Sequence, residues 1–450
     1  MSEWNTQSLA ASETLEQYIL GATWDSFPSE VKEHALVCAS DLFVTLILCS
    51  RTRMAQSGVR LAESVFPRGD IPVIGTEICF NMMGAVTAYG YSINALDIDD
   101  GHNLIKGHPG AVLAAGLLPA ALRVNATYKE FLTALIVGYE VSIRAGLALH
   151  RYYNFYHGTG SWGAFGAAAG VCKLLGADRE VLSNALGIAD YQGPLAPVMR
   201  IVEIPSMNKD GIAWGAVTGA MAVEAAMHGI TGQFYNLLEP DFQPLLDSLG
   251  KEYLCMDLYF KYFPCCRWAQ AAVMCALDLR EKYTLTYDEI EKVYIRTFKA
   301  GTQLSSVKPA FCDEAQYNMV YPVCVALTEG KFVPEYVSEE YIAANPGVVA
   351  MMDRVKFEVD NDMEAEFPKK RYAQLEILKT DGTTLVSEVH EPKGEPEEKV
   401  DIDWIADKFS AAAGAWFSSK NQEALLKTLS DANSKIPLRD IIAGINQNIL

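Results

Sequence analysis

Apolar residues recur at helical spacing through the first 260 residues of the chain, beginning with Leu15, Tyr18 and Ile19. Three segments there are rich in Gly and Ala: GAVLAAGLLPAAL from residue 110, WGAFGAAAGVCKLLG from 162 and GIAWGAVTGAMAVEAAMHG from 211. Because Gly and Ala on facing helices let the backbones approach closely, these segments predict tightly packed central helices. Hairpin signals are few in this half, so we expect an all-α domain.

After residue 260 the pattern changes to the alternation typical of strands. Apolar positions alternate over 293–298 and again over 355–359. The segments RYAQLEILK and TTLVSEV, joined by a turn at Asp381-Gly382, predict a hairpin, since Asp-Gly is a strong turn signal. Helical spacing returns from residue 402. The pattern predicts a mainly α protein: a large all-α helical domain of residues 1–262 and 401–450, and a smaller α+β lid domain of residues 263–400.

Composition and charge narrow the function. The 450 residues include 37 basic and 56 acidic side chains, a formal net charge of −19. This balance argues against nucleic acid, which requires clustered Lys and Arg. The ten cysteines form no CxxC pair, as expected of reduced thiols in a cytoplasmic protein. The N-terminal segment does not read as a signal peptide. The uncharged apolar stretches are shorter than the roughly 20 residues of a membrane span, so we expect no membrane association.

Side chains able to do chemistry are concentrated in ALDIDDGHNLIKGHPG, residues 95–110, between two apolar segments. They are Asp97, Asp99, Asp100, His102, Lys106 and His108. A carboxylate can orient a neighbouring imidazole for proton transfer. Pro109 predicts that His108 stands at a helix N-terminus, where anionic groups bind well. The same residues could instead hold a hard metal ion in a hydrolase, or form a solvated loop.

Four further segments offer polar groups near predicted buried helices or at the domain junction. These groups are His157 and Thr159 before a glycine-rich helix, Lys209 before another small-residue helix, Lys261 and Arg267 around an aromatic turn, and Tyr321 in an apolar run. Lysine and arginine can bind carboxylates, and the planar fork of arginine suits them especially well. Each group also has a structural explanation, as a packed core residue or an ordinary surface charge.

Taken in order, these segments resemble the MmgE/PrpD family. The resemblance is carried by ALDIDD followed by HPG, by HGTGSWGAFGAAAG with KLLGAD after it, by the Lys209 segment ending in HGITG, and by KYFPCCRW. The family includes 2-methylcitrate dehydratase, cis-aconitate decarboxylase and iminodisuccinate epimerase. The resemblance covers nearly the whole chain. It implies an active-site cleft between the two domains, a small polycarboxylate substrate, a homodimer, and no metal or other cofactor.

Together with the residue patterns, the resemblance indicates roles for nine residues. The expected catalytic residues are Asp97, His108, His157, Lys209 and Tyr152, and the expected substrate-binding residues are Lys261, Arg267, Tyr321 and Thr159. Removal of a proton next to a carboxylate requires a base and fixed cations facing the developing charge. We expect His108 and His157 to form the acid/base pair, with Asp97 orienting one of them.

The reaction is less constrained than the family. Decarboxylase-type sequences carry a His in the segment after Lys261, and this chain has none between Pro264 and Gln270. That difference favours a lyase of the 2-methylcitrate dehydratase type. The alternatives are an iminodisuccinate-like epimerase, a cis-aconitate-type decarboxylase, and a homologue that binds carboxylates without catalysis.

Overall fold

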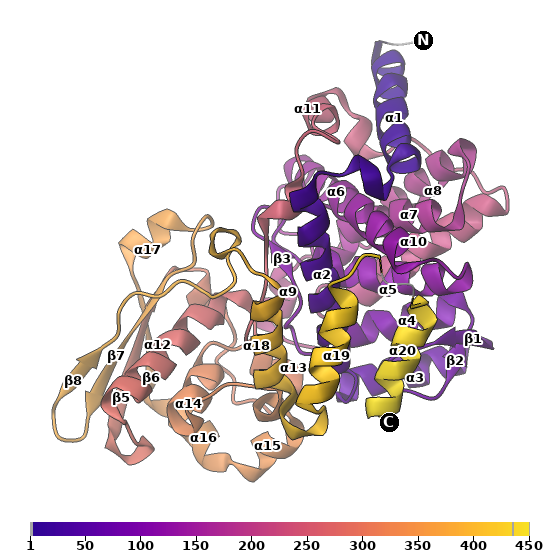
Figure 1. Ribbon diagram of the computed structural model, residues 1–450. Helices are drawn as coiled ribbons and strands as arrows, with labels where there is room; N and C mark the ends of the chain where they lie inside the picture. The colour runs from indigo at the N-terminus through magenta and orange to yellow at the C-terminus, as the bar shows by residue number, and fades with distance from the viewer. Residues whose placement is uncertain (1–2, 434–435, 450) are drawn as a thin grey trace.

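The computed structural model describes residues 3–433 and 436–449. The chain from residue 3 to about residue 260 folds into a helical body, on the right of Figure 1. Its helices are α1 (Glu3–Gly21), α2 (Ser29–Cys49), α3 (Arg53–Val65), α4 (Met82–Ile93), α5 (Pro109–Arg123), α6 (Tyr128–Tyr152), α7 (Thr159–Leu175), α8 (Arg179–Gln192), α9 (Met199–Glu203), α10 (Ile212–Met227) and α11 (Gln243–Asp247). The mainly helical fold predicted from the sequence is confirmed.

Helix α7 lies at the centre of this body, where it packs against α5, α6, α8 and α10. Its glycines permit these contacts. A Cβ on Gly160 would lie 2.2 Å from the carbonyl oxygen of Gly211, and one on Gly166 would lie 2.5 Å from Cβ of Ser142. Larger residues would push the helices apart. The prediction of tightly packed Gly- and Ala-rich central helices is therefore confirmed.

Helix α6 is long and apolar enough to cross a membrane by length and composition, but 94% of its most apolar window is buried inside the protein. It also carries a buried ion pair between Glu140 and Arg144, at 2.5 Å. These two charges interrupt the apolar run of α6. A search for uncharged apolar stretches in the sequence therefore does not find the whole helix. A core helix of a globular protein meets the same length and composition criteria.

The second lobe, on the left of Figure 1, contains a four-stranded mixed sheet of order β6-β5-β7-β8. Its strands are β5 (Ile290–Thr297), β6 (Val355–Val359), β7 (Ala373–Lys379) and β8 (Thr384–Val386). β5 pairs with β6 in parallel and with β7 antiparallel, and β7 and β8 form the predicted hairpin. Gly382 adopts a φ of +84° in its turn, which glycine tolerates without strain. The lobe's helices are α12 (Arg267–Tyr283), α13 (Cys312–Gln316), α14 (Val320–Glu329), α15 (Glu339–Ala344), α16 (Pro346–Met351) and α17 (Asn361–Glu366).

The last three helices return to the helical body. They are α18 (Ile402–Ala413), α19 (Ser419–Leu429) and α20 (Leu438–Ile449), drawn in yellow in Figure 1. α18 and α19 pack against α2, and α20 packs against α5. Lys408 on α18 donates hydrogen bonds to Asp41 Oδ1 at 2.5 Å and to the Ile98 carbonyl at 2.7 Å. The chain therefore crosses between the lobes twice.

Two short antiparallel pairs in the helical body were not predicted. β1 (Arg68–Pro72) pairs with β2 (Cys79–Phe80), and β3 (Gly101–His102) pairs with β4 (Leu258–Tyr259). β2, β3 and β4 have two residues each, too few to show an alternating pattern, and β1 contains Gly and Pro, which are uncommon in strands. The β3–β4 pair nevertheless matters, because it fixes the loop rich in Asp and His beside the segment that leads to Lys261.

Candidate active site

A cavity with about 70 Å³ of free space lies between the helical body and the second lobe. The helical body contributes Asp97, Lys106, His108, Tyr156, Val198, Val202, Asp210 and Tyr259 to its lining. The second lobe contributes Cys266, Arg267, Trp268, Tyr317 and Arg371. Five of the nine residues singled out in the sequence line the cavity or contact a carboxylate that does. Asp97, His108 and Arg267 line it, Lys261 binds Asp97, and Thr159 donates to Asp210.

The loop between α4 and α5 holds the acidic end of this site in an unusual backbone conformation. Asp97 and Lys106 have φ values of +52° and +54°, in the left-handed region that side chains with a Cβ rarely adopt. Lys209, from the loop before α10, shares this feature with a φ of +43°. The Asn94 side chain stabilises the turn by donating to Asp97 Oδ1 at 3.3 Å and to Asp99 Oδ1 at 2.6 Å. Such strain persists where surrounding contacts enforce it, often at functional sites.

His108 is positioned as a proton acceptor. It is the residue before Pro109 at the start of α5, as its sequence predicted. Its Nδ1 lies 2.9 Å from the Asp100 carbonyl oxygen. Because a carbonyl can only accept, Nδ1 donates its hydrogen there, and Nε2 is the ring nitrogen left to exchange a proton. Nε2 lies 3.7 Å from Asp97 Oδ1 and 3.8 Å from Asp210 Oδ2.

Asp99 lies behind the imidazole. Its Oδ2 is 3.4 Å from His108 Nδ1 and has no hydrogen-bond partner among the described residues. A carboxylate in this place stabilises the imidazolium that forms when Nε2 takes a proton. The arrangement of carboxylate, imidazole and open cavity is the one required of a general base.

Asp97 and Lys261 form a buried ion pair at the cavity wall. Lys261 Nζ donates to Asp97 Oδ1 at 2.7 Å, and both side chains are almost completely buried. Burial alone would raise the pKa of Asp97, but the charges of Lys261, His108 and Lys209 outweigh it and lower that pKa. Burial would lower the pKa of Lys261, and the neighbouring Asp97 and Asp99 raise it. Asp97 therefore stays a carboxylate.

The pKa of Asp210 is shifted in the opposite direction from that of Asp97. Asp210 is buried, and burial raises the pKa of its carboxyl group despite the nearby charge of His108. Its oxygens accept from Thr159 Oγ1 and from the Tyr317 hydroxyl, both at 3.3 Å. Two carboxyl groups beside one imidazole thus have pKa values displaced in opposite directions. Enzymes use such opposite shifts to keep one carboxyl group protonated, as a proton donor, while the other stays ionised.

The sequence reasoning found the segment of Asp210 but singled out the preceding residue. Lys209 Nζ donates to the carbonyl oxygens of Asn94 and Ala95 and to Gln316 Oε1, at 2.6, 3.1 and 2.5 Å. With all three ammonium hydrogens used, Lys209 holds the Asp97 loop in place and does not line the cavity. Thr159 also has a positioning contact, since its Oγ1 accepts from the His108 backbone N–H at 3.0 Å.

Three other predicted residues do not line the cavity. His157 is buried against Phe155, with ring centroids 3.9 Å apart, and burial lowers its pKa to about 4. Neither of its ring nitrogens has a partner in the part of the chain that the structure describes. Tyr321 is buried and donates to the Tyr336 carbonyl at 2.7 Å. Tyr152 is 48% exposed at the end of α6. His108 lines the cavity and His157 does not, so the two imidazoles do not face it as a pair.

The acidic loop has limited capacity for a metal ion. Ligand atoms of Asp97, Asp99 and His108 lie within 4.8 Å of one another. However, Asp97 is already paired with the Lys261 ammonium, and Asp100 accepts hydrogen bonds from the Tyr139 hydroxyl and the Gly110 backbone N–H. An ammonium 2.7 Å from the carboxylate opposes a second cation at the same oxygens.

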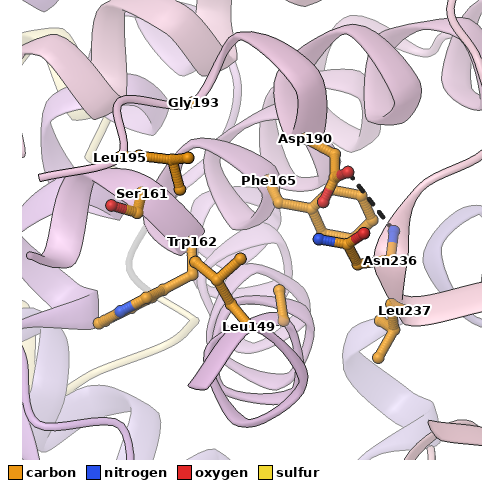
Figure 2. Close-up of a pocket in the computed structure, with 10 residues that line it drawn as sticks. Leu149, Ser161, Trp162, Phe165, Asp190, Gly193, Leu195, Asn236 and Leu237 are labelled. Carbon is orange, nitrogen blue, oxygen red and sulfur yellow. Dashed lines mark hydrogen bonds between the residues drawn. The ribbon is translucent and has the colours of Figure 1, made fainter. Parts of the chain in front are cut away.

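A second cavity, shown in Figure 2, lies among α6, α7 and α8. It has only about 20 Å³ of free space and a mostly apolar lining that includes Trp162, Phe165 and Leu149. Its one titratable group is Asp190, whose pKa is raised to about 6 by burial and which accepts from the Asn236 backbone N–H at 3.4 Å. With no cation and no base beside this carboxyl group, the cavity lacks the groups that acid–base chemistry requires.

Comparisons with known proteins agree with the two-lobe architecture. Residues 13–245 match the family model of the MmgE/PrpD N-terminal domain, and residues 263–432 match that of the MmgE/PrpD C-terminal domain. The chain is similar to a cis-aconitate decarboxylase-like protein, oryM, of Aspergillus oryzae, with 22% identity over 461 residues, covering 93% of this chain and 94% of the relative. It is also 22% identical over 441 residues to a cis-aconitate decarboxylase of Aspergillus terreus, covering 90% and 89%.

Proposed function

Because this chain belongs to the MmgE/PrpD family of enzymes that act on carboxylic acids, we propose that it is a metal-independent hydro-lyase of the 2-methylcitrate dehydratase type. The observation on which the proposal rests is the environment of His108. His108 lines the cavity, and its Nε2 lies between a carboxylate of lowered pKa, Asp97, and a carboxyl group of raised pKa, Asp210.

In the proposed reaction His108 Nε2 removes a proton from the carbon next to a substrate carboxylate. The electron pair left behind forms the carbon–carbon double bond as the hydroxyl group leaves the neighbouring carbon. Asp210 donates a proton to that hydroxyl, so that it departs as water. Burial supports this role, because it holds more of the Asp210 carboxyl group in the protonated form than in an exposed Asp.

Fixed positive charge supports the same step. Negative charge grows on the substrate carboxylate as the proton leaves, and preorganised cations stabilise it most effectively in a dry site. Arg267 lines the cavity, and Lys261 lies directly behind Asp97. The ion pairs of these residues with Glu395 and Asp97 hold their positions before the substrate binds.

Decarboxylation is the second candidate, because the similar curated proteins named above are a cis-aconitate decarboxylase and a relative of one. The segment after Lys261 argues against it. Cys266 and Trp268 line the cavity there, and burial raises the pKa of Cys266 to about 12. A thiol of that pKa does not exchange a proton readily near neutral pH, so it is a poor substitute for the imidazole of decarboxylase-type sequences.

Proton NMR of the purified enzyme in deuterium oxide tests the proposal. The substrates are 2-methylcitrate, citrate, cis-aconitate and iminodisuccinate, each with and without prior chelator treatment of the enzyme. An alkene signal from 2-methylcitrate or citrate, unaffected by the chelator, is the expected result. Itaconate from cis-aconitate would establish the decarboxylase instead, and epimer signals from iminodisuccinate would establish the epimerase. Carboxylate binding with no exchange on any acid would contradict catalysis altogether.

We also propose that the enzyme is a homodimer joined through the outer face of α10. Trp214 and Met221, seven residues apart on that face, are 57% and 42% exposed. Met227, the last residue of α10, and Ile230, just after it, are exposed apolar side chains as well. Large apolar side chains grouped on one surface usually mark a protein contact, and a closed two-fold dimer covers such a self-complementary patch on both copies.

A further inference from the structure

Arg371 is a buried cation of the cavity with unused hydrogen-bond donors. The residue is 4% exposed and lines the cavity. Within residues 3–433 and 436–449, its Nε and Nη1 have no hydrogen-bond partner, and its guanidinium forms no ion pair with an acidic side chain. Its guanidinium lies 6.0 Å from the centroid of the Phe367 ring. Burying a charge without a partner is costly, so this site is built to receive an anion.

Glu395, the acidic side chain that acts on Arg371, already has a hydrogen-bond partner for each of its oxygens. Glu395 accepts from Arg267 Nη2 at 2.7 Å through one oxygen and from Asn103 Nδ2 at 3.0 Å through the other. Arg267 uses its Nη1 on the carbonyl oxygens of Phe260 and Lys393, although its Nε also lacks a partner in the described chain. The charge of Glu395 therefore compensates that of Arg267, and the charge of Arg371 is left without a counter-ion among the described residues.

Arg371 comes from a different lobe of the protein than the proposed proton-transfer groups. It precedes β7 and comes from the second lobe, whereas His108, Asp97 and Asp210 come from the helical body. Burial lowers the pKa of Arg371, and the titratable groups that act on it most are those of Tyr259, Glu395, Arg267 and Tyr156. The cavity thus carries a cationic wall of Arg371 and Arg267 in addition to its acid–base wall.

We infer that Arg371 binds a second carboxylate of the substrate, distinct from the carboxylate beside the carbon that loses its proton. This inference rests on the proposed function and extends it by one binding residue: Arg371 is the partner of a carboxylate that lies away from the reacting carbon. Binding that carboxylate would hold the substrate across both lobes, with its reacting carbon toward His108. Arginine is the residue best suited to this task, because its guanidinium stays charged when buried.

The test measures binding without turnover. Tricarballylate has three carboxylates but no hydroxyl group to lose, so its affinity can be determined by titration calorimetry on the wild-type enzyme and on Arg371→Met. We expect the dissociation constant to rise on the order of 10- to 100-fold, as for the loss of hydrogen bonds between charged groups. Arg371→Lys should recover part of this affinity. Arg296→Met, which removes a 34%-exposed guanidinium from β5, is the matched control and should bind normally.

The thermal stability of the unliganded variant separates a ligand site from a structural one. Replacing an unpaired buried charge by an apolar side chain should leave the unfolding temperature unchanged or raise it. If Arg371→Met binds tricarballylate as tightly as the wild type, the inference is wrong, whatever the unfolding temperature of the variant. Failure of the NMR assay to show dehydration would overturn the proposed reaction alone, because the affinity comparison needs no catalysis.

Discussion

The buried pair of Asp97 and Lys261 yields a quantitative prediction. Lys261→Met removes the ammonium 2.7 Å from a carboxylate that has almost no contact with water. Breaking a buried ion pair on one side costs about 3–5 kcal/mol, because the remaining charge is left without compensation. Unfolding entropy of about 2.1 cal/mol/K per residue makes this a decrease of roughly 3–5 °C in the unfolding temperature of a chain this long, measured by calorimetry at pH 7.

The pH dependence of that loss has a defined sign. In the wild type the pKa of Asp97 lies below its ordinary value, so its stabilisation is present above the ordinary pKa and is lost as the pH falls through the lowered pKa. In the variant, burial is no longer offset by Lys261, so the pKa of Asp97 rises. Its carboxyl group then takes up a proton at a higher pH and escapes the penalty. The stability difference between the two proteins should therefore shrink from neutral pH towards about pH 4.

Two further variants isolate the cause. Lys308→Met breaks a pair of the same 2.7 Å length between exposed side chains, Lys308 and Asp353, and should cost less than about 1 kcal/mol. The double variant Asp97→Asn/Lys261→Met removes both charges and should recover most of the loss. The reasoning is refuted if Lys261→Met unfolds at the wild-type temperature, or if its deficit grows as the pH falls.

Three predictions concern the proposed chemistry and assembly. His108→Gln should lower kcat on the order of 10²- to 10⁴-fold with little change in unfolding temperature, and near-normal turnover would exclude His108 as the base. Asp210→Asn should slow the release of water more than the exchange of the substrate proton with deuterium. It should also remove the decrease in rate at high pH that deprotonation of Asp210 causes. An equal loss of both steps would contradict the role of Asp210 as the acid. Trp214→Glu combined with Met221→Glu should give monomers by light scattering, and a monomeric wild type would refute the dimer.

Much of the architecture could be predicted from local patterns. The Asp381-Gly382 turn and its flanking alternation placed the β7–β8 hairpin, and the Gly- and Ala-rich segments placed the central helices. The two-residue strands β3 and β4 could not be found in this way, because their pairing depends on a contact between residues more than 150 positions apart. Such contacts have no local signature in a single sequence.

The residues of the candidate site likewise divide into those with a local signal in the sequence and those without one. His108 was found because Pro109 and a dense acidic loop mark it locally. Asp210 was overlooked beside Lys209, since charge alone does not tell which of two neighbours faces inward from a strained loop. Arg371 had no local signal at all, because its significance lies in what it lacks: a partner for a charge that only the assembled lobes bury.

The return of α18 to the helical body sets an order for biosynthesis. Lys408 neutralises Asp41 and binds the carbonyl oxygen of Ile98, in the loop that carries the proton-transfer residues. A chain emerging from the ribosome exposes Asp41 and this loop early but supplies their ammonium only after the entire second lobe has been made. The loop of Asp97 and His108 is thus completed last, and a chain that stops before residue 402 leaves the buried carboxylate of Asp41 uncompensated beside the candidate active site.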